Sequence, residues 1–385
     1  MSRSAREFSV DSQAECTPRD ARTSGGTVLK TSVIPGASLT EAHERDWRSL
    51  VDSNPELGNP FFSIEFTRLL AEVRSDVFVL CLARDGRYVG FLPFHRDEAG
   101  VGRPLGLLVS DFQGIIAAPN TSWDVPTLLR DAGLQVWHFD HLLASQSFFS
   151  PYVLRHDESG FMDLSNGYDH YANERKQAGS RLISQLDRKA RKIEREVGPL
   201  RFEWHTTDAD VFAALREWKA AQRVETQTFD VLDYDWVMTL IEKILHEDTA
   251  EFGGVLSALY AGDRLIAAHL GMRTRRVLHW WFPSYERSVS RYSPGGILLI
   301  NIAKRCAELG IECIDLGKGD ERYKQSLQSG TTDLYIGAAD SRRLHNAARR
   351  VWFRTLAWGR ESRFHALLKL PKRVLESFRG DAIMR

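Results

Sequence analysis

The sequence predicts an α/β fold built as two similar halves, each with a mixed, mostly antiparallel sheet flanked by helices. Two observations lead to this expectation. Helical and strand-like periodicities alternate along the chain, and one order of elements occurs twice. The 385 residues suffice for two domains. An apolar fraction of 43% and an aromatic fraction of 10% are typical of a packed globular protein.

The first half, residues 31–165, has the predicted order helix, helix, three strands, helix and strand. Asp85-Gly86 is a strong turn signal between the first two strands, which indicates a hairpin. The segments, in chain order, are 41–54, 61–74, 77–86, 87–97, 103–119, 125–133 and 134–142.

The second half, residues 166–345, repeats this plan after a charged helix. Its strand and helix patterns end with a long helix, a short strand, a polar segment and a last strand. Gly262-Asp263 marks another hairpin turn. The segments, in chain order, are 181–198, 201–207, 208–226, 233–248, 253–263, 264–274, 277–286, 293–310, 312–317, 320–330 and 333–340.

Composition excludes several broad classes of function. Lysine plus arginine and aspartate plus glutamate number 51 each, so no global field points to nucleic acid or to another charged partner. The four cysteines have no zinc-site spacing and indicate reduced thiols in a cytoplasmic protein. Residues 1–30 lack the apolar run of a signal peptide and are predicted to be a disordered leader.

The C-terminal segment, residues 346–385, is predicted to be a basic tail of short amphipathic helices. Arginines alternate there with aromatic residues, including Trp352, Phe353 and Trp358. Such a tail suits peripheral contact with an anionic membrane surface. Alternatively, the aromatic residues pack on the second half as a helical cap.

The long helix predicted near residue 300 has an unusual start. Ser293 suits the N-cap, Pro294 suits the first helical position and Gly310 suits the end of the helix. Gly295 and Gly296 would each cost roughly 1 kcal/mol relative to alanine inside a first turn. A bare helix N-terminus is a ready phosphate site, whereas close packing of the helix on the sheet is the structural alternative.

The order and spacing of four segments resemble the GNAT acyltransferase superfamily. The second half most resembles the acetyltransferase domain of the CelD type, which is linked to cellulose and exopolysaccharide synthesis. That group is related to the Fem-type aminoacyltransferases, which contain tandem GNAT-like domains. The segments are "SDFQGII" (Ser110 to Ile116), "LREWKAAQ" (Leu215 to Gln222), "YSPGGILL" (Tyr292 to Leu299) and "IDLGKGDERYK" (Ile314 to Lys324).

The resemblance implies acetyl-CoA or another acyl-CoA as co-substrate in the second half. The pantetheine arm would follow residues 278–283, where a strand splays from its neighbour. The pyrophosphate would lie on the start of the following helix, at Ser293, Pro294, Gly295, Gly296 and Ile297. The first half is expected to bind no acyl-CoA and to form the acceptor side.

The segment "LGKGDERYK" supplies the catalytic candidates. Attack of an amine on a thioester builds an oxyanion and releases a thiolate, so the site needs donors at both positions. By resemblance, Tyr323 would act as the acid toward the thiolate and Lys324 would lie beside the acyl carbonyl. Asp320 or Glu321 would accept the amine proton or orient Lys324. The alternative for the two acids is a solvated helix start.

Two further residues are assigned to the acceptor substrate by resemblance. Asp111 interrupts an apolar run expected to be a strand, where a carboxylate caps a bulge or faces a cleft. Lys219 lies on a helix that would flank the cleft, although it also suits a surface position. The histidines show no metal-site spacing, so no metal is expected. Without a nucleophile motif, direct acyl transfer is favoured.

The sequence therefore predicts an acyl-CoA-dependent N-acyltransferase, most simply an acetyltransferase. Its acceptor would be an amine on an envelope or exopolysaccharide precursor, and no specific nucleic acid is expected as a partner. Two alternatives stay open. A Fem-like enzyme would take aminoacyl-tRNA as donor and would need a broad basic surface. A non-catalytic scaffold of a polysaccharide synthesis system would use the two glycines for packing.

Overall fold

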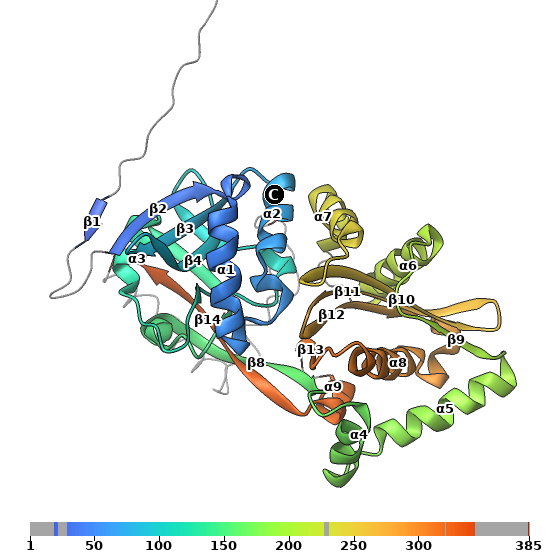
Figure 1. The fold of residues 1–385 in the computed structure, drawn as a ribbon. Helices are drawn as coiled ribbons and strands as arrows, with labels where there is room; N and C mark the ends of the chain where they lie inside the picture. Colours follow the sequence, from blue (N-terminus) through green and yellow to red (C-terminus); the bar gives the residue numbers. More distant parts are fainter. Residues whose placement is uncertain (1–18, 22–28, 227–230, 320, 343–383, 385) are drawn as a thin grey trace, which may run out of the picture.

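The computed structural model describes residues 19–21, 29–226, 231–319, 321–342 and 384. A 14-stranded mixed sheet runs through both halves of the chain, in the order β1-β2-β3-β4-β5-β7-β14-β8-β13-β12-β11-β10-β9, with β6 paired to β4. Helices cover both faces of this sheet (Figure 1). The α/β class with a mixed, mostly antiparallel sheet, predicted from the sequence, is confirmed.

The first half contains β1 to β8 and three α-helices. Helices α1 and α2 lie on one face of its sheet and α3 on the other. The strands are β1 Arg19–Ala21, β2 Leu29–Pro35, β3 Val77–Arg84, β4 Arg87–Arg96, β5 Val101–Pro104, β6 Ile116–Ala117, β7 Val136–Leu143 and β8 Val153–Asp163. The helices are α1 Glu41–Ser53, α2 Ile64–Val73 and α3 Val125–Asp131.

Among the described residues, the second half contains six α-helices and the remaining strands. Helices α6 and α7 pack on one face of its sheet, and α5 and α8 pack on the other (Figure 1). The helices are α4 Tyr168–Gln177, α5 Leu182–Glu196, α6 Ala209–Thr226, α7 Asp235–His246, α8 Pro294–Glu308 and α9 Arg322–Leu327. The strands are β9 Leu200–Glu203, β10 Phe252–Ala261, β11 Arg264–Thr274, β12 Val277–Tyr285, β13 Cys313–Lys318 and β14 Gly330–Asp340.

Two strands join the halves into one sheet. The last strand, β14, lies antiparallel between β7 and β8, both of which come from the first half. Strand β8 in turn pairs with β13 of the second half. The boundary predicted near residue 165 falls in the turn after β8, where the Gly167 N–H bonds to the Leu164 carbonyl. Strand pairing crosses the boundary between the halves, and the division into two domains stays a prediction.

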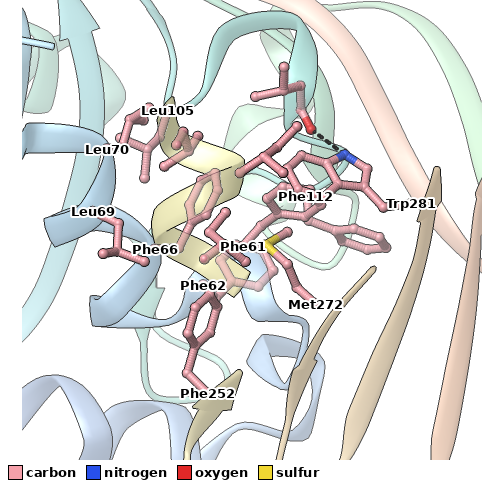
Figure 2. Packing of buried hydrophobic residues seen from close by; sticks show 14 of the residues in the cluster. Phe61, Phe62, Phe66, Leu69, Leu70, Leu105, Phe112, Phe252, Met272 and Trp281 are labelled. Carbon is pink, nitrogen blue, oxygen red and sulfur yellow. Dashed lines mark hydrogen bonds between the residues drawn. The ribbon is translucent and has the colours of Figure 1, made fainter. Parts of the chain in front are cut away.

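The largest core cluster extends across the two halves. Figure 2 shows Phe61 and Phe112 from the first half packed against Trp281 and Met272 from the second. The Trp281 indole Nε1 donates to the Val109 carbonyl at 2.9 Å, so even this polar group ties β12 to the first half. Burial of aromatic side chains of this size is a large part of what holds such an interface together.

The apolar stretch 103–119, expected to be a single strand, is broken into three pieces. Only β5 and β6 are strands, and a 3₁₀ turn at Leu107–Val109 lies between them. Gly106 and Leu107 have φ values of 79° and 53°, which are incompatible with a continuous strand. Asp111 therefore lies in a loop, and the expectation that it interrupts a strand was wrong.

Most of the predicted leader and tail lies outside the described residues. Within residues 1–30, Arg19–Ala21 form β1 and Leu29 begins β2. Within the predicted tail, 346–385, the structure describes Met384, which is fully buried and whose carbonyl accepts bonds from Arg74 and Trp236. Among the described residues, no helix combines the length and apolar character needed to span a membrane.

Candidate active site

The strands β12 and β13 separate partway along their length. They pair in parallel at Val277 with Cys313, Leu278 with Ile314 and His279 with Asp315. Beyond that point β13 no longer pairs with β12. It still pairs with β8, where Lys318 lies opposite Ser159. The strands therefore separate after His279, within the segment 278–283 where a splay was expected. Polar side chains gather at the point of separation.

Asp111 is brought to this point by a loop that is attached to β7. The Gln113 N–H donates to the His141 carbonyl at 3.0 Å, and the Leu143 N–H donates to the Gln113 carbonyl at 3.1 Å. The Gln113 side chain also accepts the Asp140 N–H at 3.0 Å. These bonds place Asp111, from the first half, beside His279 on β12.

His279 lies between two carboxylates. Its Nε2 is 3.0 Å from Asp111 Oδ2, and its Nδ1 is 3.0 Å from Asp315 Oδ1. Burial alone would lower the pKa of His279, but the two aspartates raise it to about 9. Burial would likewise raise the pKa of Asp111, but His279 lowers it to about 2. At neutral pH the site therefore holds a buried ion pair.

A second histidine lies on the other side of Asp111. His141 Nε2 is 3.6 Å from Asp111 Oδ1, and its Nδ1 is 3.2 Å from Asp140 Oδ1. Burial opposes the charged form of His141, whereas Asp140 and Asp111 favour it, and the net effect raises its pKa. Sequence reasoning missed the roles of His141, Asp140 and Asp315. A lone ionisable residue inside an apolar run was the available signal for Asp315, whereas His141 and Asp140 share their strand with His138.

Lys324 lies beneath the loop that follows β13. Its side chain is 8% exposed, and its Nζ is 3.2 Å from Glu321 Oε2. The same ammonium donates to the Lys318 carbonyl at 2.8 Å and to the Gly317 carbonyl at 3.3 Å. Its charge also contributes to the low pKa of Asp111. The structure thus brings together Lys324 and Asp111, which are far apart in the sequence.

Of the other two predicted catalytic residues, the structure describes Tyr323. Tyr323 is half-buried on α9 and packs against the cluster that contains α8. Burial raises its pKa to about 12, and the Trp280 indole partly offsets this effect. A phenol with this pKa stays protonated at neutral pH and acts as a hydrogen-bond donor. Asp320 lies outside the described residues.

The start of α8 differs in detail from the helix start expected at Ser293. The Ser293 backbone is left-handed, with a φ of 55°, and its Oγ accepts a bond from Lys189 Nζ at 2.6 Å instead of capping the helix. The N–H groups of Gly296 and Ile297 both donate to the Ser293 carbonyl. The half-exposed backbone of Gly295 and the Lys189 ammonium therefore provide surroundings that favour an anion.

Each of the two glycines in the first turn of α8 has its own surroundings. A Cβ at Gly295 would lie 3.4 Å from Tyr285 Cδ1, an ordinary contact. A Cβ at Gly296 would lie 2.7 Å from Leu186 Cδ2 on α5, which is far too close. Close helix packing therefore accounts for Gly296, and Gly295 is the glycine that packing does not require.

Lys219, the other acceptor-side candidate, lies on α6. Burial, His279 and Lys219 together lower the pKa of His269 on β11. Lys219 is thus close enough to this second buried histidine to affect its charge. Among the described residues, no group of three or more histidine, cysteine, aspartate or glutamate side chains could hold a metal ion.

Comparisons with known proteins agree with this architecture. Residues 180–325 match the family model described as an acetyltransferase (GNAT) domain. A search of curated proteins found no match. Among solved structures, FemX superposes with a TM-score of 0.54 at 10% identity, covering 83% of this chain and 99% of FemX. This likeness concerns the fold.

Two further structures have lower scores. The C-terminal domain of a proposed lysylphosphatidylglycerol synthetase from Agrobacterium fabrum has a TM-score of 0.49 at 13% identity, covering 81% of this chain and 96% of that domain. A tandem GNAT protein from the clavulanic acid pathway has a TM-score of 0.45 at 10% identity, with coverages of 82% and 99%. The family match supports an acyltransferase and leaves its donor and acceptor open.

Proposed function

We propose that this chain, with a GNAT acetyltransferase domain at residues 180–325, is an acyl-CoA-dependent N-acyltransferase. The acceptor would be an amine on an envelope or exopolysaccharide precursor, in keeping with the resemblance to the CelD type. A cytoplasmic location belongs to the same proposal. The observation that carries it is the separation of β12 from β13 beside Asp111, His279 and Lys324.

The donor phosphates would lie at the start of α8. The helix dipole favours an anion there, and Lys189 adds a positive charge at Ser293, the residue before the helix. A phosphate oxygen could take the place of Ser293 Oγ as the partner of Lys189 Nζ. The pantetheine arm would then follow β12 toward the point where β13 diverges.

The acceptor amine would bind as an ammonium group at Asp111. This carboxylate is 28% exposed and stays ionised, so it is a counter-ion and too weak a base to deprotonate an amine. His141, 3.6 Å away, is the better proton acceptor in its neutral form, because the neighbouring aspartates raise its pKa and an imidazole is a stronger base than a carboxylate. Asp140 would orient His141 through Nδ1.

Acyl transfer would then proceed directly from donor to acceptor. The bound ammonium first gives one proton to the neutral form of His141, and the amine nitrogen so formed attacks the thioester carbonyl carbon. As the carbon–sulfur bond breaks, the second proton leaves the nitrogen and goes to the departing thiolate. Lys324 supplies a buried positive charge near the oxyanion. Tyr323 supplies a hydrogen bond to the thiolate, which is a weaker base than the phenolate of a tyrosine with a pKa of about 12.

Calorimetric titration of the full chain with acetyl-CoA tests this proposal. We expect binding to the parent chain and to Gly295→Ala, which adds only a methyl group at ordinary contact distance. Gly295→Glu should abolish binding, because it places a carboxylate at the phosphate site while remaining compatible with a first helical turn. Comparison of Gly295→Ala with Gly295→Glu separates the effect of the added charge from the effect of losing the glycine.

Three outcomes would count against the proposal. Equal affinity in the parent and in Gly295→Glu would remove the start of α8 as the donor site. If the parent binds an aminoacyl-tRNA and not acetyl-CoA, the Fem-like alternative holds. If it binds neither, with or without an amino sugar such as glucosamine as acceptor, a non-catalytic scaffold is the better account.

A further inference from the structure

We propose that His279 is a positioning residue, clamped on Asp315, that holds Asp111 in one orientation as the carboxylate facing the acceptor. Its importance for catalysis rests on the function proposed above, in which Asp111 binds the acceptor ammonium. The clamp itself is a feature of the fold. It can be tested without any substrate.

The clamp joins three separate segments of the chain. Asp111 comes from the loop before β6, His279 from β12 and Asp315 from β13. Asp315 is itself fixed, because its carboxylate accepts the Ser159 hydroxyl at 3.2 Å and the Gly317 N–H at 2.9 Å. The buried carboxylate of Asp315 is therefore anchored, whereas the side chain of Asp111, at the other end of the clamp, is 28% exposed.

The distances favour the charged form of the imidazole, with Asp315 as an ion-pair partner of Nδ1. Both ring nitrogens of His279 lie 3.0 Å from a carboxylate oxygen. A neutral imidazole carries a proton on only one nitrogen, so its other nitrogen would direct a lone pair at a carboxylate. The imidazolium has a proton for each, and the positive charge is favoured by both aspartates.

Water is excluded from His279. Its side chain is 0% exposed, and the edge of Phe61 packs against the ring with centroids 5.0 Å apart. In such surroundings an uncompensated charge is costly, and the loss of either partner would leave one. The raised pKa of His279 and the low pKa of Asp111 agree with this mutual dependence.

Asp111 is restrained on its remaining sides as well. Gly317, with a φ of 70°, passes so close that a Cβ there would lie 3.3 Å from Asp111 Oδ2. Other charged or titratable groups act on the clamp from neighbouring elements: His141 from β7 and Lys324 from α9 on Asp111, and His269 from β11 on His279. The contact of Asp111 with His279, at 3.0 Å, is shorter than its contact with His141, at 3.6 Å.

Nuclear magnetic resonance of the full chain, labelled in histidine rings and aspartate carboxyl groups, tests the inference. We expect the His279 ring to carry protons on both nitrogens at pH 7.5 and to lose one near pH 9. His279→Gln keeps a donor toward Asp111 and loses the charge and the contact with Asp315. In that variant the Asp111 carboxyl should titrate at least about one pH unit higher than in the parent.

A matched control is a second buried histidine close to His279. His269 lies on the adjacent strand and stacks on Trp280, with ring centroids 4.1 Å apart. His269→Gln should leave the Asp111 titration where it is in the parent. An equal shift in both variants would mean that Asp111 responds to general loosening of the sheet, and it would overturn the proposal.

The parent chain alone decides the case if His279→Gln does not fold. A neutral His279 ring at pH 7.5 in the parent overturns the clamp. A doubly protonated ring, together with an Asp111 pKa below the ordinary aspartate value of about 3.9, supports it. Failure of the proposed function is seen separately, as absence of acetyl-CoA binding in a chain whose His279 titrates as expected.

Discussion

The two glycines at the start of α8 should respond oppositely to the same small change. Gly295→Ala and Gly296→Ala each add one methyl group to adjacent positions of one helical turn. The added Cβ meets Tyr285 Cδ1 at 3.4 Å in the first case and Leu186 Cδ2 at 2.7 Å in the second. The pair therefore isolates packing from helix propensity.

The size of the effect follows from two opposing contributions. Replacing glycine by alanine within a helix stabilises it by up to about 1 kcal/mol. Tyr285 is 44% exposed and can move, so Gly295→Ala should raise the free energy of unfolding or leave it unchanged. Leu186 is 2% exposed and packed between α5 and α8, and overpacking of this kind costs about 1 to 3 kcal/mol. Gly296→Ala should therefore be less stable than Gly295→Ala by about 1 to 3 kcal/mol.

Urea denaturation at pH 7, followed by tryptophan fluorescence and by circular dichroism, measures this difference. Leu186→Ala provides the internal check, because it removes the side chain that the new methyl group strikes. In the double variant Leu186→Ala, Gly296→Ala, the penalty for the second substitution should disappear. If Gly296→Ala is as stable as Gly295→Ala, or if the penalty persists without the leucine, close packing of α5 is not the reason for Gly296.

Three further predictions follow from the site and the termini. Asp111 and Asp315 overcome the effect of burial and raise the pKa of His279 from 6.5 to about 9. The stabilisation that they give is therefore complete below pH 6.5 and is lost as the pH rises through 9. The free energy of unfolding of the parent should fall by on the order of 3 kcal/mol over that range relative to His279→Gln, as measured by urea denaturation at several pH values. Tyr323→Phe and Lys324→Met should each lower the turnover number by roughly ten- to a thousandfold with little change in acetyl-CoA affinity, and a change confined to the Michaelis constant would exclude a catalytic role. A chain ending at residue 345 loses the Met384 contacts with Arg74 and Trp236, so its thermal midpoint should fall. An unchanged midpoint, together with lost sedimentation on anionic vesicles, would instead favour the membrane role of the tail.

The local elements were largely predictable from the sequence. Turn residues fixed the hairpins: Asp85 and Gly86 have φ values of 53° and 77°, and Gly262 has a φ of 61°. The helix expected at 293–310 is α8, Pro294–Glu308, with Gly310 at a φ of 76° after its end. Turns and helix ends depend on residues that are neighbours in the sequence, so a single sequence is enough to predict them.

The arrangement around Asp111 was much less predictable. Asp111 and His279 are separated by 168 positions, and no local periodicity indicates which distant strands pair. The sequence did show a lone ionisable residue within each of three apolar runs, at Asp111, His279 and Asp315. Taken together, these three positions are the signal that a buried charge network exists, since an isolated buried charge is unfavourable.

The position of the site has a consequence for the matched region, residues 180–325. That region contains His279, Asp315 and Lys324, but Asp111 and His141 lie in the first half, as does β8, which pairs with β13. Strand β14, which follows the region, completes the connection by pairing with β7 and β8. The matched region thus supplies the separated strands and would supply the donor side, whereas the carboxylate and the imidazole that would meet the acceptor come from outside it. Because β14 and β8 fix the two halves within one sheet, the acceptor groups are held at a set distance from the strands along which the acyl donor would lie.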